Sequence, residues 1–144
     1  MSKLIFFPTN YVEITLDKDG LLQFMELLRS KKGKLSFPLS NTTSGMISVR
    51  CLEVKPVQKE TFSGTDYHIM CLCDLKSSVV QFRFDEDGFS EMQYILNFIY
   101  ETGDHFHMFA DFDLFVGKEE SEEISVIKAV TIYLQEEPVC QLSR

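Results

Sequence analysis

His105 and His107 come closest, by residue type and spacing, to a chemical site in this chain of 144 residues. Two imidazoles at positions i and i+2 share one face of a strand, and three carboxylates stand nearby, on Asp104, Asp111 and Asp113. A zinc site requires three or four convergent ligands. A metal-dependent active site built on the two histidines is therefore one interpretation of this segment.

A second interpretation assigns the histidines to the surface. In an alternating strand, His105 and His107 occupy the polar face while Phe106 and Met108 point inward. We favour this interpretation, because only one other histidine is present in the chain to complete a ligand set. A third interpretation is that the two exposed imidazoles contact a partner protein.

The tetrapeptide Asp-x-Asp-Gly occurs twice, at residues 17–20 and 85–88. It resembles the start of a calcium-binding loop, but the EF-hand pattern requires a longer ligand series that ends in a glutamate. Helix capping explains the motif more simply, because an aspartate carboxylate can accept the free amide hydrogens of a first helical turn. We expect Asp19 and Asp87 to be the two capping residues.

The four cysteines do not form paired C-x-x-C motifs. Cys71 and Cys73 are expected on one face of a strand, and we interpret the thiols as buried and inert. A reduced state fits a chain in which the apolar run at residues 4–7 is too short for a signal peptide and no run is long enough for a membrane helix. We therefore expect a cytoplasmic protein without membrane contact.

The two Asp-x-Asp-Gly motifs belong to a longer internal repeat, since Asp87 follows Asp19 by 68 positions and Val80 follows Val12 by the same interval. Each copy is expected to contain two strands, a helix that ends at a glycine, Gly33 or Gly103, and two further strands. The second helix should be about two residues longer. The expected strands are residues 3–7, 11–16, 34–39 and 46–57 in the first copy, and 67–75, 80–84, 105–109 and 124–134 in the second.

This pattern predicts a single α+β domain over residues 1–144, built of two strand-strand-helix-strand-strand repeats at about residues 1–60 and 66–136. About eight mostly antiparallel strands should pack with two helices. The sequence leaves open whether the strands form one sheet or two. It also suggests that 13 phenylalanines, with no tryptophan present, build much of the core.

Charge is distributed unevenly along the chain. The formal net charge is −8, and it divides into +3 for residues 1–60, −4 for residues 61–100 and −7 for residues 101–144. Nucleic-acid binding is not expected, because it requires a basic surface. The run Glu119, Glu120, Ser121, Glu122, Glu123 is either a solvated loop or an electrostatic docking surface for a basic partner.

Common catalytic motifs are missing from the sequence. It contains no P-loop, no G-x-G-x-x-G, no nucleophile elbow and no H-E-x-x-H. We therefore expect a protein without enzymatic activity, cofactor or resident metal.

Residues 79–134 resemble one family of immunity proteins from bacterial polymorphic-toxin and contact-dependent growth inhibition systems. The resemblance rests on the strand at residues 79–84, a glycine-led helix with Phe89, Ile95 and Leu96, the segment Gly-Asp-His-Phe-His-Met at residues 103–108, and the apolar strand at residues 126–134. It implies a cytosolic protein that binds and occludes one cognate toxin without catalysis.

The sequence therefore predicts neutralisation of a basic, nuclease-type toxin domain by a charge-complementary complex. The expected contact residues are Asp104, His105, His107, Asp111, Asp113, Glu119, Glu120, Glu122 and Glu123. The alternatives are a regulatory or structural module that binds another protein, with a homodimer through a sheet edge as one form of it, and a metal-dependent enzyme that uses the two histidines.

Overall fold

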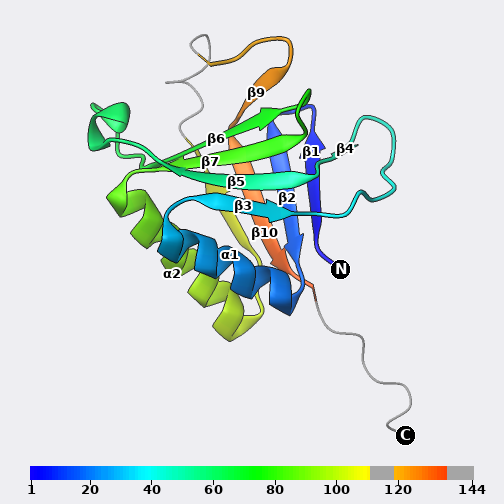
Figure 1. Cartoon of the computed structure of the whole chain (residues 1–144), viewed down its shortest axis with the longest axis horizontal. Coiled ribbons are helices and arrows are strands. Elements are labelled where there is room, and N and C mark those ends of the chain that lie inside the picture. The colour runs from blue at the N-terminus through cyan, green and yellow to red at the C-terminus, as the bar shows by residue number, and fades with distance from the viewer. Residues whose placement is uncertain (111–118, 136–144) are drawn as a thin grey trace, which may run out of the picture.

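The computed structural model describes residues 1–110 and 119–135, and it places their ten strands in two five-stranded sheets with two α-helices (Figure 1). We call the sheet with strand order β4-β1-β2-β10-β8 the first sheet and the sheet with order β3-β5-β7-β6-β9 the second sheet. The elements are β1 (Lys3–Phe7), β2 (Tyr11–Leu16), α1 (Lys18–Ser30), β3 (Gly33–Ser36), β4 (Ile47–Ser48), β5 (Cys51–Pro56), the 3₁₀ turn η1 (Lys59–Phe62), β6 (Ile69–Asp74), β7 (Val79–Phe84), α2 (Glu86–Thr102), β8 (Phe106–Phe109), β9 (Ile124–Ile127) and β10 (Ala129–Leu134).

The predicted α+β class with mostly antiparallel strands is confirmed. Six of the eight strand pairings are antiparallel, and two are parallel. The strands number ten because the two long strands expected at residues 46–57 and 124–134 are each divided between the sheets. In the first copy, β4 joins the first sheet and β5 the second, and in the second copy β9 joins the second sheet and β10 the first.

The division occurs where the chain passes from one sheet to the other. Val49 lies between β4 and β5, is fully buried, and donates its amide hydrogen to the Leu4 carbonyl at 2.8 Å. The exposed Lys128 lies between β9 and β10, and its amide donates to the Asn10 carbonyl at 2.9 Å. Both crossings keep the backbone hydrogen-bonded, so neither requires a turn motif that the sequence would reveal.

The two sheets are built to the same plan. The second sheet read in reverse, β9-β6-β7-β5-β3, matches the first sheet strand for strand when each element is replaced by its counterpart in the other copy. In each sheet, a hairpin from one copy pairs in parallel with a strand from the other: β2 with β10, and β7 with β5. Each sheet is therefore completed by the opposite half of the chain.

Each helix begins at the first aspartate of its Asp-x-Asp-Gly motif, which corrects the prediction of Asp19 and Asp87 as caps. The Asp17 carboxylate accepts from the Gly20 amide at 2.7 Å, and the Asp85 carboxylate accepts from the Gly88 amide at 2.8 Å. The N-cap must have extended backbone, and its side chain must reach the amide three residues later, a geometry that the second aspartate of the motif does not have.

The helix ends are partly as predicted. Gly103 ends α2 in the left-handed region, with φ 76°, and its amide donates to the Ile99 carbonyl. The corresponding prediction for Gly33 is wrong, because Lys31 takes the left-handed position at φ 64° and Gly33 begins β3. With 17 residues against 13, α2 exceeds α1 by more than the two residues expected.

The two helices lie side by side next to the sheets (Figure 1). Helix α1 contacts β2 and β3, and α2 contacts β7 and β10, so each helix touches both sheets. A chain of phenyl rings runs through the resulting core, with centroid separations of 6.2 Å, 5.6 Å and 4.9 Å along Phe24, Phe82, Phe84 and Phe89. Both sheets and both helices thus share one apolar core.

Candidate protein-binding face

The outer face of the first sheet carries a group of aromatic and histidine side chains, which we call the aromatic face. Strand alternation turns Leu4, Val12, Val130 and Met108 into the core, so the intervening residues point away from it. Strand register then places these outward residues in three rows across β1, β2, β10 and β8. The rows are Phe7, Tyr11, Ala129 and Phe109; Ile5, Glu13, Thr131 and His107; and Lys3, Thr15, Tyr133 and His105, the last just before β8.

The histidines lie as the favoured interpretation expected. His105 and His107 are exposed, while Met108 is buried and Phe106 packs against the core. The His105 ring stacks on Tyr133 at 5.4 Å, and the His107 ring meets Phe109 edge-on at 5.0 Å. Aromatic neighbours therefore surround both imidazoles.

The ring contacts continue across the sheet. The centroid of Tyr11 lies 6.1 Å from that of His107 and 5.2 Å from that of Phe7. Phe109 remains 62% exposed at the edge of the group. A continuous set of aromatic rings on an accessible sheet face is the composition found at the centre of protein interfaces.

A line of polar groups crosses the middle of this face. Thr131 is only 2% exposed, and its hydroxyl shares a hydrogen bond of 2.5 Å with Nδ1 of His107. The Tyr11 hydroxyl donates to a carboxylate oxygen of Glu13 at 3.2 Å. Burial is the main cause that raises the pKa of the Tyr11 phenol to about 12. Tyr11 therefore stays protonated and remains a hydrogen-bond donor at neutral pH.

The second sheet differs because the chain covers part of its own outer face. Phe62, from η1, packs on Met70, Leu72 and Val126 to form a small apolar cluster separate from the main core. The register makes Leu72 the counterpart of Ile5 on the first sheet. Part of the apolar area on the outer face of the second sheet is thus covered by η1, which follows the first copy.

The polar side chains on the second sheet are paired among themselves. Gln81, the counterpart of Glu13, donates to Glu53 at 2.8 Å and accepts from the Arg83 Nε at 2.6 Å. Arg83 also forms an ion pair of 3.3 Å with Glu119. These groups satisfy one another, and Glu53, Gln81 and Arg83 line an open pocket of about 300 Å³ together with apolar residues that include Leu72, Val79 and Ile124.

The acidic residues expected to bind a partner do not gather in one patch. Glu120 accepts from the Asn10 side chain at 3.1 Å, beside the start of β10, whereas Asp104 shares a cleft with Leu134 and Gln135 at the other end of that strand. Six strand residues separate the two ends by roughly 20 Å. Glu119 is held by Arg83, Glu122 and Glu123 are exposed, and Asp111 and Asp113 lie outside the described residues.

Neither the histidines nor the cysteines gather into a metal centre where the structure is described. Within residues 1–110 and 119–135, no group of three His, Cys, Asp or Glu side chains could hold a metal ion. Cys71 and Cys73 lie buried on one face of β6, as expected, and burial raises the pKa of the Cys73 thiol to about 12 and that of Cys71 well above its usual value. Such thiols are poor nucleophiles at neutral pH.

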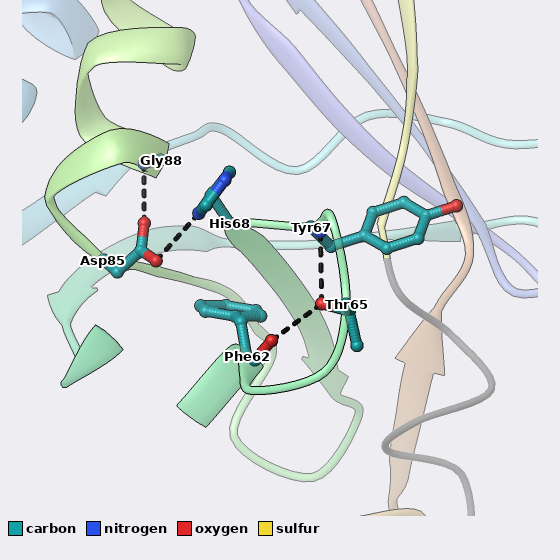
Figure 2. Close-up of polar contacts among 6 residues, drawn as sticks. All are labelled: Phe62, Thr65, Tyr67, His68, Asp85 and Gly88. Carbon is teal, nitrogen blue, oxygen red and sulfur yellow. Dashed lines mark hydrogen bonds and ion pairs between the residues drawn. The ribbon is translucent and has the colours of Figure 1, made fainter. Parts of the chain in front are cut away.

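A histidine–carboxylate pair joins the residue before β6 to the start of α2 (Figure 2). Nδ1 of His68 lies 2.9 Å from one oxygen of Asp85, whose other oxygen accepts from the Gly88 amide. Asp85 is 3% exposed, and its hydrogen bond to His68 is the main cause that raises the pKa of the imidazole. A Cβ on Gly88 would overlap the His68 carbonyl, which explains the glycine at this position.

Sequence reasoning missed several of these residues. Tyr11, Glu13, Thr131, Tyr133 and Phe109 were not among the predicted contacts, although strand alternation marks each as an outward residue. Their grouping depends on the parallel pairing of β2 with β10, whose residues stand more than a hundred positions apart. No local signal reveals such a pairing.

None of the helices within the described residues is long and apolar enough to cross a membrane. No protein family, curated protein or solved structure was found to match this chain.

Proposed function

We propose that this chain is a non-catalytic immunity protein that acts in the cytoplasm by binding a cognate, basic, nuclease-type toxin domain. The aromatic face carries the proposal. It presents exposed His105, His107 and Phe109 beside the partly exposed Tyr11 and Tyr133, whereas Phe62 covers part of the matching face of the second sheet.

The composition of the aromatic face suits a protein partner. Tyrosine and phenylalanine dominate the binding energy of interfaces when they lie at the centre, and charged residues prefer the rim. Here Tyr11, Tyr133 and Phe109 occupy the face itself, while Asp104 and the exposed Glu120 stand near its two ends. An aromatic centre with acidic ends fits a basic protein surface.

Charge supports the same class of partner. A nuclease domain is basic because its substrate is a polyanion, and a protein with net charge −8 is attracted to it over several ångströms. Occlusion of the surface that binds the nucleic acid would then neutralise the toxin without any chemical step.

A second candidate is a homodimeric module. Strand β8 is an edge strand with the sequence Phe-His-Met-Phe, which contains no lysine, proline or glycine. Its counterpart β3 contains Gly33 and Lys34, residues that discourage edge pairing. The free edge of β8 could therefore pair with the same strand of a second molecule.

Growth rescue tests the proposed function. The toxin to use is the C-terminal domain encoded by the gene immediately upstream in the source genome, expressed in a bacterial host together with this chain. The wild-type chain should restore growth, and a variant with both Tyr133→Ala and Phe109→Ala should not.

The matched control is Tyr94→Ala. Tyr94 is 70% exposed on α2, so its removal changes a similar aromatic side chain outside the aromatic face. The control should rescue growth as well as the wild type does. Failure of the wild-type chain to rescue, combined with a dimer in light scattering that Phe109→Ala dissociates, would favour the homodimeric module instead.

A further inference from the structure

We propose that Glu13 is the receptor for an arginine side chain of the protein partner, a proposal that rests on the proposed function. The inference assigns the chemistry at the centre of the aromatic face: one carboxylate, with aromatic rings around it, that accepts one guanidinium group.

Glu13 lies in the middle of the face. It belongs to the central row, on β2, where register puts Ile5 on one side and Thr131 on the other. It is half-buried, and it is the only Asp or Glu in the three rows of outward residues. A partner that covers the aromatic rings would therefore cover this carboxylate as well.

A buried carboxylate without a cation is costly, so an interface that covers Glu13 must supply one. Within the described part of the chain, Glu13 forms no ion pair, and its recorded side-chain contact is the hydrogen bond from the Tyr11 hydroxyl. Lys3 lies in the neighbouring row of the same face, yet it makes no ion pair with Glu13. A carboxylate can accept further hydrogen bonds at its two oxygens.

On the second sheet, the position that corresponds to Glu13 has its hydrogen-bond partner within the chain. Gln81 replaces Glu13 there, and Arg83 donates to the Gln81 side chain at 2.6 Å. In the first sheet, the counterpart of Arg83 is Thr15, so the internal guanidinium is missing from this place. The partner's arginine would take the role that Arg83 has on the second sheet.

The surroundings of Glu13 favour arginine among the cationic side chains. Tyr11 stands two residues before Glu13 on the same strand face, and Tyr133 lies diagonally across on β10. Outward residues at this spacing are roughly 7 Å apart. A planar guanidinium can therefore pair with the carboxylate while it stacks against a tyrosine ring, a combination that an ammonium group achieves less well.

A peptide titration tests this inference directly. The probe is the capped tripeptide Gly-Arg-Gly, and the readout is the change in amide and tyrosine ring chemical shifts of the isotope-labelled protein. We expect saturable shifts at Glu13, Tyr11 and Tyr133. The same peptide with citrulline in place of arginine keeps the shape but lacks the charge, and it should produce no saturable shifts.

Two matched variants locate the carboxylate. Glu13→Gln preserves an oxygen that accepts from Tyr11 and should weaken arginine-peptide binding by about tenfold or more, since a charge-assisted hydrogen bond is lost. Glu53→Gln makes the same charge change on the second sheet and should leave binding unaltered. Equal binding by wild type and Glu13→Gln, or no saturable binding at all, would overturn the assignment.

The peptide titration and the growth-rescue assay distinguish failure of the arginine receptor from failure of the proposed function. The peptide titration uses no toxin, so it reports on Glu13 alone, while growth rescue with the aromatic variants reports on the face. Rescue that depends on Tyr133 and Phe109, together with a negative titration, would reject the arginine receptor and retain the immunity function.

Discussion

Asp85 joins the start of α2 to the residue before β6 through its two carboxylate oxygens. One oxygen caps α2 at the Gly88 amide, and the other is hydrogen-bonded to His68. The group is buried, so its charge is compensated by the amide and, when His68 is protonated, by the imidazolium. A single side chain thus caps α2 and holds it against the segment before β6.

This pair predicts a pH-dependent contribution to stability. Since the folded-state pKa of His68 is raised, its stabilisation is fully present below the unfolded pKa of about 6.5 and is lost as the pH rises through the folded pKa. The unfolding free energy of the wild type should therefore exceed that of His68→Gln by more at pH 5.5 than at pH 9. Urea denaturation of both proteins at the two pH values measures the difference. An equal gap at both pH values would contradict the ion pair.

The position of the cap predicts a contrast between two aspartates of one motif. Asp85→Ala should cost about 1–2 kcal/mol of unfolding free energy through loss of the cap. Asp87→Ala removes an exposed carboxylate from the first turn and should cost no more than about 0.5 kcal/mol. Chemical denaturation at neutral pH compares them, and a larger loss for Asp87→Ala would restore the cap assignment expected from the sequence.

Among the helices and strands, the spacing of apolar residues was sufficient to predict features that depend only on neighbouring residues. Strands β1 and β2 have the bounds predicted, because β1 is an apolar run that ends before Pro8 and β2 alternates with a period of two in burial. The outward direction of His105 and His107 follows from the same period. The buried faces of both helices follow from the spacing of their apolar residues, and Phe24 and Met92 are fully buried.

The pairing of strands that are distant in the chain could not be predicted from local sequence patterns. The passage from β4 to β5 at Val49 changes sheet without a proline or glycine, so residues 46–57 look like one strand. The cap at Asp85 instead of Asp87 depends on the angle at which β7 enters the helix. Glu13 and Tyr133 become neighbours on the aromatic face only through the pairing of β2 with β10.

At the scale of the whole molecule, the two copies are interwoven. The parallel pairings Val12 with Val130 and Val80 with Leu52 each join strands from different copies, and all four side chains are fully buried. Neither sheet is complete within one copy, and both contribute to one core. Loss of either sheet would expose the apolar surface of the other, which favours a single cooperative unfolding transition.

Thiol labelling tests this cooperativity. Ile132→Val removes one buried methylene from the first sheet and should cost about 1 kcal/mol. The buried Cys71, in the second sheet, should then react about fivefold faster with a thiol reagent under conditions where labelling reports global unfolding. The measurement uses a Cys51→Ser, Cys140→Ser background so that Cys71 and Cys73 are the remaining thiols. An unchanged labelling rate would show that the second sheet opens independently.

The uneven charge of the molecule predicts electrostatic steering of the partner. Glu122 and Glu123 are exposed, and neither side chain has an ion pair or hydrogen bond recorded within the described residues, so Glu122→Gln with Glu123→Gln should preserve the fold. The double variant should associate more slowly with the toxin domain at low salt, and the difference should shrink as salt is added. Stopped-flow association rates at two ionic strengths provide the comparison. Identical rates at low salt would exclude this segment from steering.

Affinity for the proposed toxin domain should depend on the aromatic face. Calorimetric titration of the toxin domain with the wild-type chain, Tyr133→Ala and Tyr94→Ala tests it most directly. We expect Tyr133→Ala to raise the dissociation constant about thirtyfold, the effect of losing an aromatic residue central to an interface, and Tyr94→Ala to leave it unchanged. A dissociation constant that is insensitive to Tyr133→Ala, or that rises with Tyr94→Ala, would contradict binding through the aromatic face.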